Sequence, residues 1–287
     1  MNHAFPRPER PRRRRGRLTR RGRLLLLVTA LLVVAAAVAV PLLLLRPEAQ
    51  PPVVAKKRTL LIPEGWRAGQ VYTAVDRALK LPTGTARKAM TAAAPVLPAA
   101  ARGNPEGYLF PATYPIESST TPENLLRYMV RTAGERFGTA GITAGAQRHG
   151  LSLHQTVIVA SIVQAEADSV EDMAKVARVV HNRLARGMAL QMDSTLNYAL
   201  NRSTVDTSYE DTRIDSPYNT YERKGLPPTP IANPGEQAMA AAIDPAQGDW
   251  LYFVTVRPGD TRFTADYAEQ QRNVQDFNEE RRRATEG

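Results

Sequence analysis

The sequence predicts an α+β protein with a single N-terminal transmembrane helix, a small α/β subdomain, and then a mainly helical domain with a small antiparallel sheet. Residues 24–45 form an uncharged apolar run, which predicts the transmembrane helix. Residues 151–198 place apolar side chains at helical spacing behind capping residues, which predicts the helical core. Residues 250–256 form the clearest buried strand of the chain, and residues 261–264 are placed to pair with it as a hairpin.

The first 23 residues form a basic segment in which ten arginines accompany a single acid, Glu9. They contribute +9 of the formal net charge of +10. The segment is rich in Pro and Arg and has no apolar periodicity, so we expect a disordered tail. Residues 24–287 carry 28 basic and 27 acidic side chains. The basicity therefore belongs to the tail, and it gives no reason to expect that the folded part binds nucleic acid.

The apolar run 24–45 has 22 residues, interrupted only by Thr29 and Pro41, and is long enough to cross a bilayer. A secretory signal is the alternative, but its apolar core is usually shorter and precedes a small-residue cleavage site, whereas this run stops at Arg46. We therefore expect an uncleaved single-pass anchor in the cell membrane. The arginines before it predict a cytoplasmic N-terminus and an extracytoplasmic C-terminal domain. The tail then lies on anionic lipid headgroups or contacts a cytoplasmic protein.

A Pro-rich tether, residues 46–58, follows the anchor. The remaining residues lack cysteine, so the exported part must be stable without disulfides. A short strand is predicted at 59–63, and helices are predicted at 68–79 and 85–94. This small unit either binds a ligand or packs on its neighbour, and its residues alone favour packing.

The next residues, 104–116, are punctuated by Pro, Gly and aromatic residues and suit a strand or a cleft wall. Thr121 before Pro122 predicts a helix that ends near Phe137.

The central stretch begins with Ser152 and Gln155, a capping box that predicts a helix from about Leu153 to about Glu166. Val159, Ile162 and Val163 precede Glu166 by seven, four and three residues, so all four share one face. Poor solvation and the negative end of the helix dipole should both raise the pKa of the Glu166 carboxyl. A carboxyl that stays protonated near neutral pH can act as a general acid. A Glu near a helix end is nevertheless more often an ordinary surface residue.

The second central helix starts after Ser169, and Gly187 is placed to end it. Residues 188–201 predict a loop that leads into a short helix. Residues 216–235, rich in Pro, Gly and aromatic side chains, predict a rigid loop of the kind that is usually functional. Asn233 before Pro234 predicts the cap of a helix that ends near Ile243, and a charged helix at 266–283 closes the domain.

Several motifs resemble the YceG-like family of membrane-anchored endolytic murein transglycosylases. They are IVASIVQAEA, VVHNRLARGMALQMDSTLNYAL, SPYNTYERKGLPPTPIANPG and WLYFVTV, with LLIPEGW and EGYLFPATYPI upstream. The resemblance covers roughly residues 59–275. It implies a reduced LysM-like subdomain at 59–100 and a YceG-like catalytic domain at 101–287. The 13-residue tether leaves no room for the larger LysM-like region of the family, which argues against independent glycan binding by the reduced unit.

The resemblance implies that Glu166 is the catalytic acid, because it ends the motif ASIV-x-x-E. Many members carry a further Glu where this chain has Gln164. Glu166 would protonate the glycosidic oxygen between N-acetylmuramic acid and N-acetylglucosamine within peptidoglycan glycan strands. It would then accept the proton of the muramic acid C6 hydroxyl, leaving a 1,6-anhydro end. Neither a metal nor an organic cofactor is implied. Glycan synthases and division or elongation proteins are the partners expected at the family level.

The resemblance also suggests a substrate cleft around Glu166. Asn219 would bind an N-acetyl group, and the rings of Tyr218 and Tyr221 would stack on sugars or simply pack in the core. Asp193 either contacts substrate or caps the short helix that starts near Ser194. The full set of predicted substrate-binding residues is Glu106, Gln191, Asp193, Ser194, Tyr198, Tyr218, Asn219, Thr220 and Tyr221.

No metal site is expected. Thr261 and Gln270 stand where the family often has histidines. Three histidines follow the apolar run. His149 and His154 are expected to be exposed at helix ends, and His181 is expected on a helix face.

Three hypotheses follow for the function. The first is a lytic transglycosylase that cuts nascent strands close to the membrane and so limits their length. The second is a hydrolytic muramidase that uses Glu166 together with Asp193 and leaves reducing ends. The third is a wall-binding or cell-division scaffold without catalysis, in which Glu166 is structural.

Overall fold

The computed structural model describes residues 19–44, 58–93, 96–202 and 207–286. The chain divides into two compact units, residues 1–56 and 57–287. The predicted tail up to residue 18, Leu45 and most of the predicted tether lie outside the described residues.

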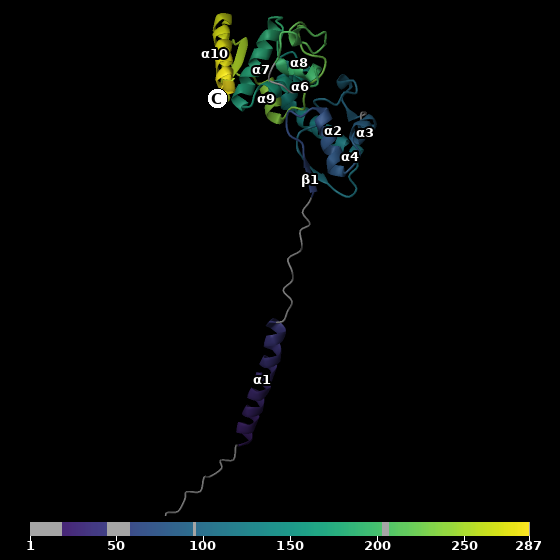
Figure 1. Cartoon of the computed structure of the whole chain (residues 1–287). Coiled ribbons are helices and arrows are strands. Elements are labelled where there is room, and N and C mark those ends of the chain that lie inside the picture. Colours follow the sequence, from purple (N-terminus) through teal and green to yellow (C-terminus); the bar gives the residue numbers. More distant parts are fainter. Residues whose placement is uncertain (1–18, 45–57, 94–95, 203–206, 287) are drawn as a thin grey trace, which may run out of the picture. The chain divides into compact units, whose positions relative to one another are not determined.

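Helix α1 (Arg20–Leu44) is the described element of the first unit (Figure 1). It starts four residues before the predicted transmembrane helix, because the arginines that precede the apolar run are good helix formers. Its segment Arg20–Pro41 has a mean hydropathy of 2.8. Among the described residues it is the one helix that is long and apolar enough to cross a membrane, a property that anchors and signal sequences share.

The second unit begins with a two-stranded antiparallel sheet of β1 (Arg58–Leu61) and β2 (Thr113–Ile116), with Arg58 opposite Ile116. Helices α2 (Ala68–Leu79), α3 (Thr85–Ala93) and α4 (Pro122–Phe137) pack with this sheet around one hydrophobic cluster. The helix bounds agree with the prediction to within a residue. The sheet joins a strand before residue 100 to a strand after it, and the proposed division at 100/101 stays a prediction.

A second hydrophobic cluster surrounds α6 (Leu153–Glu166). Residues 156–163 of this helix are all buried, because α5 (Ala140–Arg148), α7 (Val170–Ala185), α8 (Asp193–Ala199) and α9 (Glu236–Ile243) all contact it. The capping box of Ser152 and Gln155 is present, and Ser169 caps α7 as predicted. Short 3-10 turns occur at Ala99–Ala101 and Asp211–Arg213.

The predicted cap of α9 is wrong. Gly235 occupies the cap position, without a side-chain hydrogen bond. The Asn233 side chain instead accepts from the backbone N–H of Leu109 at 2.8 Å and donates to the carbonyl of Trp66 at 2.7 Å. Asn233 therefore ties the long loop 216–235 to the segments before α2 and β2, a contact that local sequence signals do not encode.

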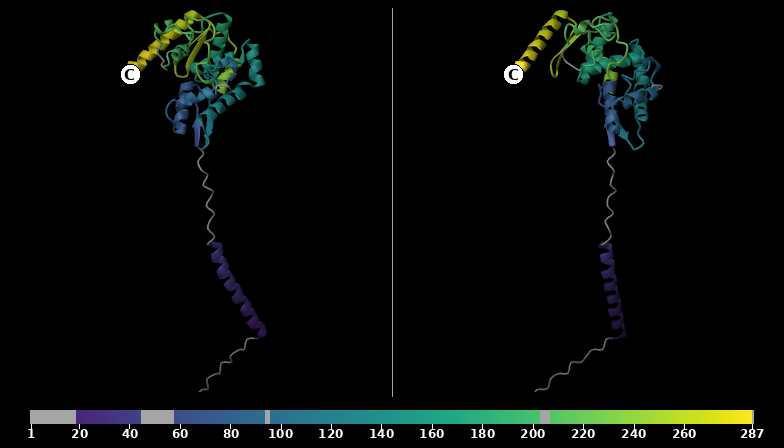
Figure 2. Two further views of the ribbon diagram at one scale, coloured as in Figure 1. Left: turned by 90° about the vertical axis from the view of Figure 1, so that its right-hand side faces the viewer. Right: turned by 45° about the vertical axis from the view of Figure 1, so that its right-hand side comes forward.

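Strands β3 (Tyr252–Arg257) and β4 (Asp260–Thr264) form the predicted hairpin, and α10 (Tyr267–Glu286) packs against it. In this unit α10 lies at the opposite end from α2, α3 and α4 (Figures 1 and 2). The prediction that this strand is buried is wrong for most of it. Tyr252 to Val254 are half-buried and Val256 is buried, because a two-stranded sheet covers too little area to enclose its strands.

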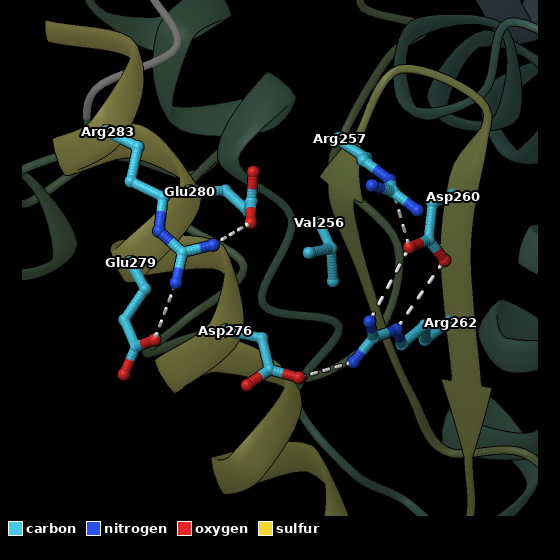
Figure 3. A pocket seen from close by; sticks show the side chains of 8 residues that line it. All are labelled: Val256, Arg257, Asp260, Arg262, Asp276, Glu279, Glu280 and Arg283. Atoms are coloured by element: carbon cyan, nitrogen blue, oxygen red, sulfur yellow. Dashed lines mark hydrogen bonds and ion pairs between the residues drawn. The ribbon is translucent and has the colours of Figure 1, made fainter.

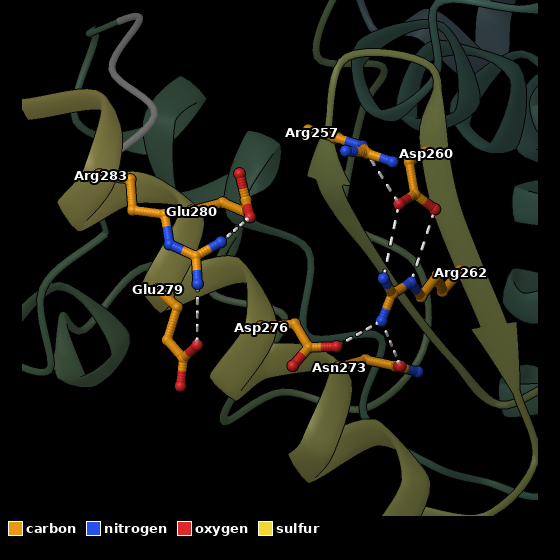
Figure 4. Close-up of polar contacts among 8 residues, drawn as sticks. All are labelled: Arg257, Asp260, Arg262, Asn273, Asp276, Glu279, Glu280 and Arg283. Carbon is orange, nitrogen blue, oxygen red and sulfur yellow. Dashed lines mark hydrogen bonds and ion pairs between the residues drawn. The ribbon is translucent and has the colours of Figure 1, made fainter. Parts of the chain in front are cut away.

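Between the hairpin and α10 lies a small charged crevice of about 220 Å³ (Figure 3). Arg262 spans it and pairs with Asp260 at 3.5 Å and with Asp276 at 2.6 Å (Figure 4). Arg283 pairs with Glu279 and Glu280 further along α10. The charged residues that line the crevice are paired with one another, and the Arg262–Asp276 pair joins the hairpin to α10. Over the described residues the fold is mostly helical with small antiparallel sheets and an apolar N-terminal helix, which confirms the predicted fold class.

Candidate active site

Glu166 ends α6 and is held by the start of α8. Ser194 donates its hydroxyl to Glu166 Oε1 at 2.6 Å and its backbone N–H to the same oxygen at 3.3 Å. Burial is the main cause that raises the pKa of the Glu166 carboxyl, and the negative charge of Asp193 adds to it. The Ser194 hydrogen bonds act in the opposite direction, because they stabilise the carboxylate. The predicted direction of the pKa shift is confirmed, with burial as its largest cause.

The neighbouring Gln164, which stands where many family members have a second acid, has a structural contact. Its side-chain oxygen accepts from the backbone N–H of Gly235 at 3.0 Å. A Cβ at Gly235 would meet the carboxylate of Glu64, which is the end of an exposed, flexible side chain. Gln164 therefore positions the end of the loop 216–235 beside α6.

Asp193 is the first residue of α8 and forms a short hydrogen bond with the loop. The hydroxyl of Tyr221 donates to Asp193 Oδ1 at 2.5 Å. The alternative that Asp193 caps the helix is wrong, because Met192 occupies the cap position and Asp193 lies inside the first turn. Burial raises the pKa of the Tyr221 hydroxyl, followed by its bond to Asp193 and the charges of Asp193 and Glu166. Tyr221 thus stays protonated and donates to Asp193.

The start of α8 is set by Thr220. Its hydroxyl oxygen accepts from the backbone N–H of Met192 at 3.0 Å, and its carbonyl accepts from that of Gln191 at 2.9 Å. Gln191 has a left-handed backbone with φ of 51°, which turns the chain into the helix. The Thr220 hydroxyl also pairs with that of Thr195 at 2.9 Å. Thr220 and Gln191 therefore shape the site through the backbone.

Asn219 is fully buried, and its polar side-chain atoms have protein partners. It donates to the carbonyls of Thr212 and Ile214 at 3.0 and 2.9 Å and accepts from the N–H of Tyr221 at 3.0 Å. This geometry favours a structural role in the loop, and the sugar contact of Asn219 stays a prediction.

Arg183, on α7, is a site residue that the sequence reasoning missed. It is buried, and it donates to the carbonyls of Leu190 at 2.5 Å and Leu251 at 2.6 Å. It also reaches Ala189 and the side chain of Gln191. Burial lowers the pKa of its guanidinium. In the sequence, its signal is a charged residue on an otherwise apolar helix face. In the structure, Arg183 positions the segment that leads into α8.

Glu106 forms a second buried carboxyl centre. Its Oε1 accepts from the N–H of Ala68 at 2.9 Å and from Asn233 at 3.3 Å, and the Tyr198 hydroxyl donates to Oε2 at 3.3 Å. Burial raises the pKa of Glu106 to about 7. The ring of Tyr198 lies 4.9 Å from that of Tyr218.

Seven of the predicted site residues form two clusters, and the other three support the first cluster. Glu166, Asp193, Ser194 and Tyr221 form one cluster, and Glu106, Tyr198 and Tyr218 form the other. Helix α8 links them, because Ser194 and Tyr198 are four residues apart and share one helix face. Gln191, Asn219 and Thr220 build the loops that hold the first cluster.

The described histidines make their hydrogen bonds and ring contacts with residues outside both clusters. His149 and His154 are half-buried and hydrogen-bonded, so the expected exposure is wrong. His149 packs on His181 with ring centroids 4.3 Å apart, and each ring contacts a carbonyl at the end of α9. Within the described part of the chain, no group of three or more His, Asp or Glu side chains is arranged to hold a metal ion.

Comparison with known proteins identifies the family to which this mostly helical domain belongs. The sequence matches the YceG-like family over residues 42–276, and the chain belongs to that family. A crystal structure of a YceG-like protein from Listeria monocytogenes, at 2.6 Å resolution, is similar with a TM-score of 0.67 and 30% identity, covering 75% of each chain.

Two curated relatives are named endolytic murein transglycosylase. That of Bacillus subtilis (strain 168) is 39% identical over 160 residues, which are 55% of this chain and 44% of the relative. That of Streptococcus pneumoniae serotype 2 (strain D39) is 32% identical over 247 residues, 75% of this chain and 44% of the relative. The chain therefore spans less than half the length of either relative.

Proposed function

We propose that this protein is an endolytic murein transglycosylase that cleaves peptidoglycan glycan strands, with Glu166 as both acid and base. The observation that carries the proposal is the half-buried Glu166 carboxyl, which accepts two hydrogen bonds from Ser194 on a single oxygen. The names of the two relatives support the reaction class.

The geometry assigns different roles to the two oxygens of Glu166. Both Ser194 donors reach Oε1, which marks it as the acceptor oxygen of a protonated carboxyl. Among the described residues Oε2 has no hydrogen-bond donor or acceptor, so the proton resides there, ready for transfer. Burial raises the pKa of the Glu166 carboxyl and so favours the protonated form that a general acid needs.

Glu166 then transfers the proton to the glycosidic oxygen between N-acetylmuramic acid and N-acetylglucosamine, and the C1–O bond breaks. The C6 hydroxyl of the same muramic acid bonds to C1 and releases its proton to the Glu166 carboxylate. The product ends in 1,6-anhydro-muramic acid, Glu166 is reprotonated, and no water is consumed. One carboxyl suffices because the substrate supplies the nucleophile.

A second candidate is a hydrolytic muramidase, which one observation favours. Asp193 lies close enough to Glu166 for its charge to raise the pKa of the Glu166 carboxyl. Hydrolases that act on glycosides normally use two such carboxyl groups. However, the Tyr221 hydroxyl occupies Asp193 Oδ1, which leaves one oxygen of Asp193 to activate water.

The proposal places the enzyme at the cell membrane, with α1 as a single-pass anchor and the N-terminus in the cytoplasm. The arginine excess before the apolar run supports this orientation. A short tether would keep cleavage close to the membrane and so limit the length of nascent strands. Residues 59–100 would be the reduced LysM-like unit and residues 101–287 the catalytic domain, with glycan synthases or division and elongation proteins as partners.

The test is digestion of purified glycan strands by the full chain in detergent, with wild type beside Glu166→Gln and the ends identified by mass spectrometry. Anhydro ends from wild type alone support the transglycosylase. Reducing ends that disappear in both Glu166→Gln and Asp193→Asn support the muramidase instead. Strand binding without any cleavage would contradict both and favour a scaffold.

A further inference from the structure

A large cavity lies beside the second carboxyl centre. It has a volume of about 870 Å³, is open to solvent on one side, and is lined by the start of α2, the segment around Glu106 and the end of α8. Its floor is buried and includes Tyr72 and Glu106, whereas Gln70 and Arg87 at its rim are exposed. This volume is in the upper part of the range of about 300–1,000 Å³ that is typical of ligand sites. Glu166 and Ser194 do not line it.

The side chains that line this cavity favour an anionic ligand. Three guanidinium groups, of Arg67, Arg87 and Arg202, line it together with one carboxyl, Glu106. Glu106 is buried at the floor of the cavity, so the charge at the rim comes mainly from the arginines.

The three arginines differ in the contacts that they make within the protein. Arg67 donates to the carbonyls of Asn197 and Arg202, and Arg202 pairs with Asp211. Arg87 lies over the ring of Tyr72, with 5.2 Å between its Cζ and the ring centroid. Among the described residues, no carboxylate pairs with Arg87. Arg87 is therefore the cation that a bound anion can reach.

Helix α8 contributes a residue to the cavity and another to the proposed catalytic site. Tyr198 lines it, and Ser194, four residues earlier on the same face of α8, holds Glu166. One turn of helix is about 5.4 Å. A substituent of a sugar bound near Glu166 can thus extend into the cavity.

Two carboxylates of a muramic acid residue have the required chemistry. One is the lactyl carboxylate of a residue without a peptide, and the other belongs to the stem peptide that is attached to the lactyl group. A lactyl group would leave most of the 870 Å³ empty, whereas a peptide of several residues would occupy it. The volume therefore favours the peptide.

We propose that this cavity is a subsite for the stem peptide of a muramic acid residue next to the cleaved bond, with Arg87 as the contact for a peptide carboxylate. The inference rests on the proposed function, because it assumes that a glycan strand binds at Glu166. Its consequence is selectivity for strands that carry peptides over strands from which the peptides have been removed.

The first test is direct binding of a synthetic stem pentapeptide that ends in D-Ala-D-Ala to the full chain in detergent, measured by calorimetry. Wild type and Glu166→Gln should bind with the same Kd. Arg87→Gln should weaken binding about fivefold, the loss expected for one partly exposed charge contact, and Arg87→Lys should weaken it less. Arg77→Gln, which removes an exposed arginine of α2 outside the cavity, should change nothing.

The second test compares cleavage of peptide-bearing strands with cleavage of strands treated with an amidase. Wild type should have a higher kcat/KM on peptide-bearing strands, and Arg87→Gln should lose this preference through KM. Equal kcat/KM on both strands, or Arg87→Gln indistinguishable from Arg77→Gln, would overturn the subsite. An Arg87-dependent preference for amidase-treated strands would assign the lactyl carboxylate and overturn the peptide assignment. Pentapeptide binding through Arg87 without cleavage of any strand would support the subsite while refuting the transglycosylase.

Discussion

Substitution of Glu106 by Gln should stabilise the protein in a pH-dependent way. The Glu106 side chain is 4% exposed, and burial raises its pKa from 4.5 to about 7. Between these pH values the folded protein retains a proton that the unfolded chain releases. The free energy of unfolding therefore falls as pH rises through this window, and it becomes level above about pH 7.

The size of the effect follows from the same pKa values. A rise from 4.5 to about 7 corresponds to about 3 kcal/mol at pH values above both. Gln cannot ionise, and its amide oxygen can still accept from the N–H of Ala68 and from Asn233. Glu106→Gln should therefore match wild type near pH 4 and exceed its stability by about 3 kcal/mol at pH 9.

The assay is urea unfolding of the full chain in non-ionic detergent between pH 4 and pH 9, followed by tryptophan fluorescence. Trp66 lies at the cavity beside Glu106 and reports on this region. Exposed Glu117 offers a matched control, because Glu117→Gln should change stability by less than about 0.5 kcal/mol at every pH. A difference between Glu106→Gln and wild type that does not vary with pH would refute the assignment of a raised pKa to Glu106.

Three further substitutions test the construction of the site. Ser194→Ala removes the hydroxyl that donates to Glu166, so kcat should fall about tenfold or more. Because this hydrogen bond lowers the pKa of Glu166, its loss should raise that pKa and move the alkaline limb of the pH–rate profile to higher pH. An unchanged profile would contradict this role. Thr220→Val leaves the N–H of Met192 without an acceptor and should lower the free energy of unfolding by about 1–3 kcal/mol in urea titrations, whereas no loss would mean that this bond contributes nothing. Arg183→Met removes the donors to the carbonyls of Leu190 and Leu251 and should lower the free energy of unfolding by about 2–5 kcal/mol in the same titrations. Arg183→Lys should lower it less, and equal losses for the two variants would contradict the hydrogen-bonding role.

The bounds of most helices could be predicted from the sequence because their signals are local. Helix α6 starts after the Ser152 cap and ends at Glu166 as predicted, and α4 and α7 start after the expected Thr121 and Ser169. Helix α5 was not predicted, because its sequence AGITAGAQR is dominated by small residues and has a weak apolar stripe.

The contacts of the site could not be predicted in the same way, because they join distant segments. Glu166 and Ser194 are 28 residues apart, and Asn233 reaches Trp66 across 167 residues. The face of α6 predicted a buried carboxyl, but only the fold shows that Ser194 holds it. The cap expected at Asn233, and the cap that was one alternative for Asp193, were wrong for the same reason, since tertiary partners replace the local bonds.

The central claim is that Glu166 drives cleavage without water, and digestion of glycan strands in water enriched in ¹⁸O tests it most directly. Wild type should release ends that contain no ¹⁸O and have the mass of 1,6-anhydro-muramic acid, and Glu166→Gln should release none. Incorporation of one ¹⁸O at each new reducing end would show that water is the nucleophile and would contradict the account.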